Sequence, residues 1–113
     1  MSEFEDLRMI ELVKKFKVDV LQIEETRSAA LFKQASKDLQ SVYNFHLTAD
    51  KPFKSVDAYL KNIYKSFNCS AVIVNSALKK KAVKSEDATL LDECIQIMIK
   101  CCDVIIAKLS KKK

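Results

Sequence analysis

Apolar residues recur at helical spacing along most of the chain, and their pattern divides it into three long segments. Over residues 3–45, 52–78 and 86–109, apolar positions repeat every three or four residues while charged residues fill the positions between them. This is the period of a helix with one buried face. The pattern predicts an all-α protein, an antiparallel bundle of three long helices joined by short connections.

The first segment leaves open whether residues 3–45 form one helix or two. The apolar pattern weakens over residues 24–28 and resumes at Ala30 and Leu31 with its phase unchanged. Neither glycine nor proline enforces a turn there, since the chain has no glycine and its one proline is Pro52. We therefore favour one continuous helix, with or without a kink, and expect a bundle of four helices if the chain breaks near residues 26–28.

The composition excludes several classes of protein. The tight turns of β-hairpins and the loops that cradle phosphate groups depend on glycine, which this chain lacks. The 113 residues are 49% hydrophobic and 31% charged, which predicts one folded domain over residues 1–113. No stretch approaches the ~20 apolar residues of a membrane-spanning helix.

Three of the four cysteines, Cys94, Cys101 and Cys102, lie in the very apolar last segment. Cys94 and Cys101 share a helix face but stand about 10 Å apart along it, too far to bind one zinc ion. Cys94, Met98 and Cys102 form a ladder of soft ligands of the kind that Cu(I) takes. We expect core packing of reduced thiols instead, with no metal and no cofactor.

Catalytic constellations are not evident. His46 is the only histidine, and we expect it at a helix end rather than beside a cysteine. The Glu-x-x-His motifs of di-iron bundles do not occur in the sequence. The sequence therefore predicts a protein that is not an enzyme. An acidic start without a secretory leader predicts a cytoplasmic or nuclear location.

Positive charge is concentrated in the second half. Residues 1–50 carry seven basic and nine acidic residues, whereas residues 51–113 carry thirteen lysines and six acidic residues. The densest group is Lys79, Lys80, Lys81 and Lys84, and three more lysines end the chain. One hypothesis is therefore a basic module that binds nucleic acid, weakly and by backbone electrostatics, or an acidic membrane surface.

The favoured hypothesis is a non-enzymatic protein–protein interaction module, an adaptor or a subunit of a helical assembly. A continuous first helix would be about 60 Å long and the last about 36 Å, so the overhang would need a protein partner or a second copy to cover it. The residues predicted to contact this partner are Leu12, Val18 and Phe32, apolar positions off the main stripe.

Overall fold

The protein is an all-helical bundle of four helices. The computed structural model describes residues 2–26, 29–48, 54–80 and 85–110, and within these ranges it contains no strand. The helices are α1 (Ser2–Thr26), α2 (Ala29–Thr48), α3 (Asp57–Lys80) and α4 (Ser85–Ser110), and a short 3-10 helix, η1 (Lys54–Val56), leads into α3. The all-α bundle predicted from the apolar pattern is confirmed.

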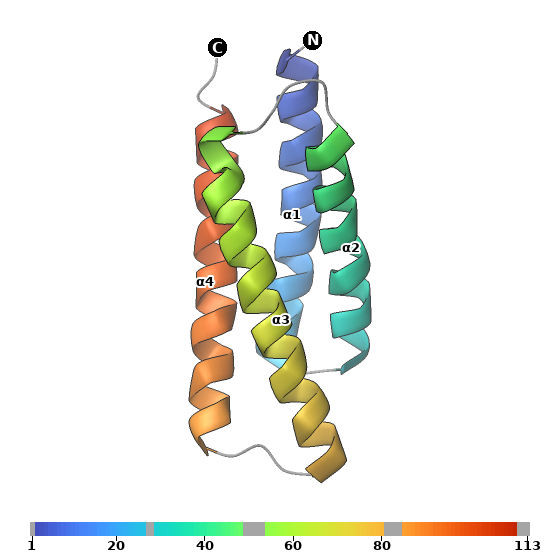
Figure 1. Cartoon of the computed structure of the whole chain (residues 1–113), viewed down its shortest axis with the longest axis vertical. Helices are drawn as coiled ribbons and strands as arrows, with labels where there is room; N and C mark the ends of the chain where they lie inside the picture. Colours follow the sequence, from blue (N-terminus) through green and yellow to red (C-terminus); the bar gives the residue numbers. More distant parts are fainter. Residues whose placement is uncertain (1, 27–28, 49–53, 81–84, 111–113) are drawn as a thin grey trace.

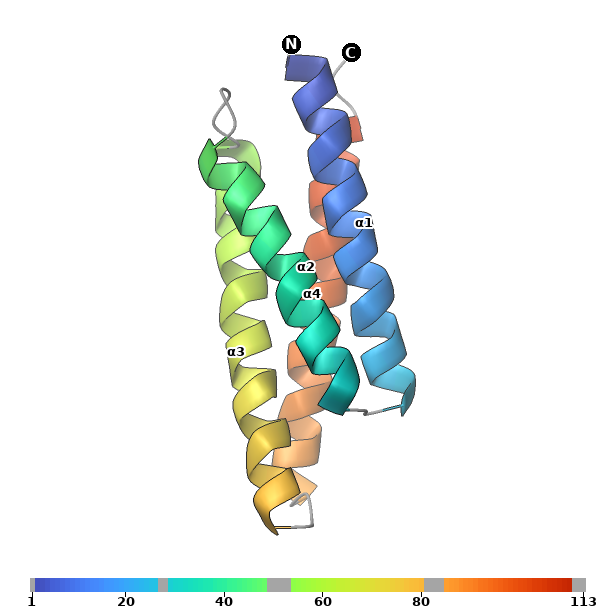
Figure 2. The same cartoon turned by 90° about the vertical axis from the view of Figure 1, so that its right-hand side faces the viewer.

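The four helices run alternately down and up the long axis of the molecule (Figure 1). The molecule measures 49 × 20 × 20 Å, because all four helices lie along its long axis and pack side by side across it. α1 packs on α2 and α4, and α3 packs on α4, whereas α2 and α3 are the neighbours that pack least closely. The ends of α3 and α4 project beyond the connected ends of α1 and α2 (Figure 2).

Every helix contributes one apolar face to a single core. At its centre the ring of Phe67 meets Phe16 edge-on, with 6.0 Å between ring centroids, and lies 5.9 Å from Phe32. The buried apolar side chains of this core are Met9, Ile10, Val13, Phe16, Val20 and Ile23 from α1; Phe32, Ala35, Leu39 and Val42 from α2; Val56 from η1; Leu60, Ile63, Phe67 and Ile73 from α3; and Leu91, Ile95, Met98, Cys101, Cys102, Ile105 and Leu109 from α4.

The prediction of one continuous helix over residues 3–45 was wrong, and the four-helix alternative is confirmed. α1 ends at Thr26, whose hydroxyl donates a hydrogen bond to the carbonyl of Gln22 at 2.9 Å, and α2 begins at Ala29. Breaking the helix forfeits a few backbone hydrogen bonds worth about 1 kcal/mol each. Folding α2 back buries several large side chains, each contributing roughly 1.5–3 kcal/mol, so burial outweighs helical continuity.

This break also removes one reason for expecting a partner. With α2 folded against α1, no helix among the described residues exceeds 26 residues, so the overhang expected of a first helix about 60 Å long does not exist. α3 begins at Asp57, after η1, and so later than the predicted start at residue 52, whereas the boundary between α3 and α4 agrees with the sequence. α3 ends at Lys80 and α4 begins at Ser85, close to the limits that the apolar pattern predicts.

Polar contacts join α1 to α4 along the surface. The ammonium of Lys17 bonds to the carboxylate of Asp103, and the amide of Gln96 donates to Glu24. Their energetic contribution is small because they are solvent-exposed, so they set alignment more than stability. None of the described helices combines the length and the apolar character that crossing a membrane requires.

Candidate functional site

The surface of α1 that points away from the core carries a stripe of exposed apolar side chains. Phe4 is 73% exposed, Leu7 57%, Val18 53% and Leu21 41%. We call the surface formed by Phe4, Leu7, Glu11, Lys14, Val18 and Leu21 the outer face of α1. Large apolar side chains scattered singly over a protein surface are ordinary, but these four share one side of one helix.

The opposite side of the same helix is fully buried. Met9, Phe16 and Ile23 are at most 1% exposed, and they lie seven residues apart. At about 100° per residue, positions spaced in this way point to the side opposite the outer face. α1 is therefore apolar on two sides, of which the core covers one.

The three predicted partner residues are placed differently. Val18 is exposed on the outer face of α1. Leu12 is half-buried and packs against the core. Phe32 is 8% exposed and packs on Phe67, so its predicted exposure was wrong, because the break before α2 turns it inward. Phe32 also forms part of the wall of an open hollow of about 580 Å³ between α2 and α3.

Sequence reasoning missed the other apolar members of the outer face. Apolar spacing alone does not separate Leu7 from the buried positions, although it lies eleven residues, about three helical turns, before Val18 and therefore on the same side. Asp19 is one of the charged residues between the apolar positions, yet it is buried against α2. The angular positions contained this information, but apolar character alone did not show which side of α1 would be covered.

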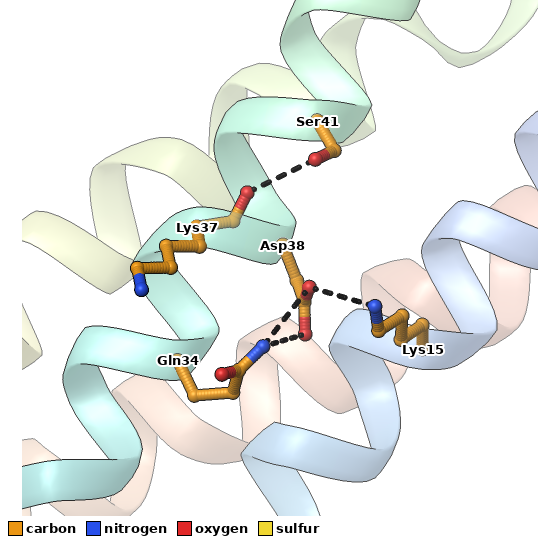
Figure 3. Close-up of polar contacts among 5 residues, drawn as sticks. All are labelled: Lys15, Gln34, Lys37, Asp38 and Ser41. Carbon is orange, nitrogen blue, oxygen red and sulfur yellow. Dashed lines mark hydrogen bonds and ion pairs between the residues drawn. The ribbon is translucent and has the colours of Figure 1, made fainter.

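A second feature is a pair of buried carboxyl groups between α1 and α2. Asp19 is 8% and Asp38 5% exposed. As Figure 3 shows, Asp38 accepts hydrogen bonds from Nε2 of Gln34, which lies 3.4 Å from each carboxyl oxygen. It also forms an ion pair with Nζ of Lys15 at 3.5 Å. The Oδ2 atom of Asp19 is buried and has no hydrogen-bond partner among the described residues.

The pKa values of the two acids are shifted in opposite directions. Burial, followed by the hydrogen bond and the negative charge of Asp38, raises the pKa of Asp19 from 3.8 to about 7. Burial also acts to raise the pKa of Asp38, but the hydrogen bonds from Asp19 and Gln34 and the charge of Lys15 outweigh it and lower that pKa. Asp19 therefore donates to an ionised Asp38 below about pH 7.

A shallow polar hollow of about 590 Å³ opens on the surface beside this pair. Its wall includes Arg8, Leu12, Lys15 and Asp38. Arg8 is engaged with Glu11 at 3.5 Å and Lys15 with Asp38, so these cations already have acidic partners. The hollow offers no nucleophile beside a base, and we assign it no chemistry.

His46 lies in the last turn of α2, as predicted, and its partner is a carboxylate rather than a thiol. Its Nε2 lies 3.0 Å from Oδ1 of Asp57, whose other oxygen is 3.1 Å from Nζ of Lys61. These hydrogen bonds, that of Lys61 first, lower the pKa of Asp57. The contact joins α2 to the start of α3, and with the Tyr43–Tyr64 ring pair it holds together the least closely packed side of the bundle.

The four cysteines are free thiols, and three of them are buried in the core. Burial raises the pKa of Cys94 to about 11 and that of Cys102 to about 12, and it also raises the pKa of Cys101. Cys94 additionally contacts Cys69 of α3. These thiols are protonated at neutral pH, which makes them poor nucleophiles and poor metal ligands. Within the described ranges, no three His, Cys, Asp or Glu side chains gather as metal ligands would.

The predicted anion-binding lysines lie mostly outside the described residues. Lys79 and Lys80 belong to the last turn of α3, whereas Lys81, Lys84 and the three C-terminal lysines fall in the ranges that the structure does not describe. Anion binding by these residues therefore stays a prediction.

Of the candidates, the outer face of α1 is the one whose residues have no covering structure within the described chain. Comparison of the chain with protein-family models, with curated protein sequences and with solved structures found no match.

Proposed function

We propose that this chain is a non-enzymatic protein–protein interaction module, and that it binds its partner through the outer face of α1. The observation that carries the proposal is the exposure of Phe4, Leu7, Val18 and Leu21 on the side of α1 that the core leaves uncovered. Removing apolar surface from water stabilises a complex by roughly 25 cal/mol per Å², so such a stripe gains free energy when another surface covers it.

The form of the stripe indicates the kind of partner. It is straight and follows a single helix, so it fits a second helix packed alongside better than a loop or a flat sheet. Adaptors and subunits of helical assemblies associate in this way. The proposed function is therefore association with another helical protein, or with another copy of this one.

The remaining reactive groups have structural contacts that support a non-enzymatic role. His46 is engaged with Asp57, Asp19 with Asp38, and Cys102 is buried in the core. The position of each of these groups is explained by its contacts within the fold and requires no role in binding a substrate.

The test is co-purification from cells with wild-type chain and with two variants. Val18→Glu combined with Leu21→Glu places two charges on the outer face, and we expect it to lose the proteins that co-purify with the wild type. Ile97→Glu, at a 44% exposed position on α4, is the matched control and should retain them. Identical protein sets for all three chains would contradict the proposal.

The alternative, a basic module that binds polyanions, has its own discriminating test. Reversing the charge of Lys79, Lys80, Lys81 and Lys84 to Glu removes four cations, so we expect any affinity for heparin or RNA to fall and the slope of affinity against salt to flatten. Polyanion binding by the wild type that this change leaves intact would count against the alternative. If the partner binds to the outer face of α1, we expect the same variant to keep its protein partner.

A further inference from the structure

The residues of the outer face of α1 follow a strict heptad spacing. Phe4, Leu7, Glu11, Lys14, Val18 and Leu21 are separated by three, four, three, four and three residues. This is the spacing of the a and d positions that form the seam between two helices of a coiled coil. The core residues Met9, Phe16 and Ile23 occupy the position farthest from that seam, so the seam is fully available for a second helix.

The order of side chains along the seam is self-complementary. It reads apolar, apolar, acidic, basic, apolar, apolar. When two copies of α1 lie antiparallel about a twofold axis between Glu11 and Lys14, Glu11 of each copy faces Lys14 of the other. Phe4 then faces Leu21 and Leu7 faces Val18, twice each. A twofold contact of this kind uses the same patch on both subunits and closes on itself.

Other arrangements of the same seam are unfavourable. A parallel pair would place Glu11 against Glu11 and Lys14 against Lys14. An antiparallel pair displaced by one heptad would place Leu7 against Glu11 and Phe4 against Lys14. Apolar layers combined with one polar layer therefore specify a single orientation and a single register.

The exposed apolar positions of α4 lack this symmetry. Leu90 and Ile97 are exposed and lie seven residues apart, with Val104 seven residues further on and half-buried. Across an antiparallel contact centred on this stretch, Glu93 would face Val104 of the second copy. Position 97 is therefore a control for nonspecific effects of exposed apolar residues.

We infer that the occupant of the outer face of α1 is a second copy of this chain, docked antiparallel with Glu11 facing Lys14 across the twofold axis. This rests on the proposed function and names its partner. The seam from Phe4 to Leu21 is about 26 Å long and one helix wide, which places it at the low end of the size range of specific interfaces. The dimer is consequently weak and depends on protein concentration.

Variants of Glu11 and Lys14 distinguish the specific antiparallel dimer from nonspecific apolar association of α1. Glu11→Lys and Lys14→Glu each place like charges across the axis, and each should raise the dissociation constant by about tenfold or more. Mixing the two variants restores both opposite-charge contacts, so a heterodimer should form with near wild-type affinity. The chain carrying both changes should homodimerise again. Sedimentation equilibrium measures all four samples, with Ile97→Glu as the control that should associate like the wild type.

Two results would overturn the inference: a wild-type chain that stays monomeric up to millimolar concentration, or single charge variants that associate as the wild type does. Folding is checked by circular dichroism, and the Glu11 side chain is 70% exposed, so its replacement leaves the core intact. If the chain is monomeric while another protein still co-purifies in a manner that depends on Val18 and Leu21, the dimer is wrong and the proposed function stands. If both experiments fail, both proposals fall.

Discussion

At the scale of single residues, the buried acid Asp19 is the feature with the clearest energetic consequence. Its carboxyl group lies against that of Asp38 with one oxygen lacking a donor among the described residues, and its pKa is raised from 3.8 to about 7. An acid that is more readily protonated in the folded state than in the unfolded state stabilises the fold most at low pH. That contribution is lost as pH rises from about 4 through 7.

We therefore predict that Asp19→Asn flattens the decline of stability between pH 5 and pH 8. An amide can donate to Asp38 at every pH, so the variant should be more stable than the wild type at pH 8, by on the order of 1–2 kcal/mol. Urea unfolding at several pH values measures the effect. A variant whose stability falls with pH as steeply as that of the wild type would show that Asp19 is ionised throughout.

The thiols provide a second prediction at this scale. Cys94, Cys101 and Cys102 are buried with raised pKa values, whereas Cys69 is half-buried. In the native protein we expect one thiol to react with an aromatic disulfide reagent much faster than the other three, since the thiolate is the reactive form. In urea all four should react.

The fast phase should disappear in Cys69→Ser, which serves as the control. Rapid reaction of three or four thiols in the folded state would mean that the last helix is not the centre of the core.

The burial of Asp19 could not be predicted from the sequence, because Asp19 has the same side chain as a solvent-exposed acid. Only the position of α2 decides that it is buried.

At the scale of helices, the periodicity predicted nearly every element. The end of α3 and the limits of α4 follow from the apolar spacing and from the lysine-rich boundary before Ser85. The break between Thr26 and Ala29 was the alternative and not the favoured prediction, because the apolar phase continues across it and no glycine or proline marks it. Its cause is tertiary: the apolar face of α2 is buried only when α2 folds back to pack on α1 and α3.

If the connection is a simple turn, lengthening it should cost little. We predict that four Gly/Ser residues inserted after Arg27 lower the free energy of unfolding by less than about 1 kcal/mol, because loop-closure entropy grows slowly with length. The same insertion after Gln40, within α2, is the control. It displaces the buried positions of the helix and should unfold the protein, and both effects are measured by thermal unfolding.

An insertion after Arg27 that costs as much as the control would contradict the break and favour a continuous helix.

The unexpected break also explains why Phe32 was predicted to be exposed. On a continuous helix it would lie off the main stripe, and only the reversal of direction before α2 brings it against Phe67.

At the scale of the whole molecule, the bundle has one closed core and one helix with a second apolar side. Val18 was identified from the sequence because it lies off the buried stripe, and the structure places it on the surface. Phe4, Leu7 and Leu21 were not identified, because a sequence shows that a helix has two apolar sides but not which side the bundle covers. The interaction surface was therefore predictable at one position, and its extent required the arrangement of the four helices.

The central claim is that the outer face of α1 contacts another protein, and photo-crosslinking tests it most directly. A photoreactive amino acid in place of Val18 should yield a covalent adduct with a second protein chain in cells. The same amino acid in place of Val72, which is 67% exposed on α3, should yield none. The mass of the adduct identifies the partner, and we expect a dimer of this chain. No adduct at position 18, or equal adducts at both positions, would contradict the claim.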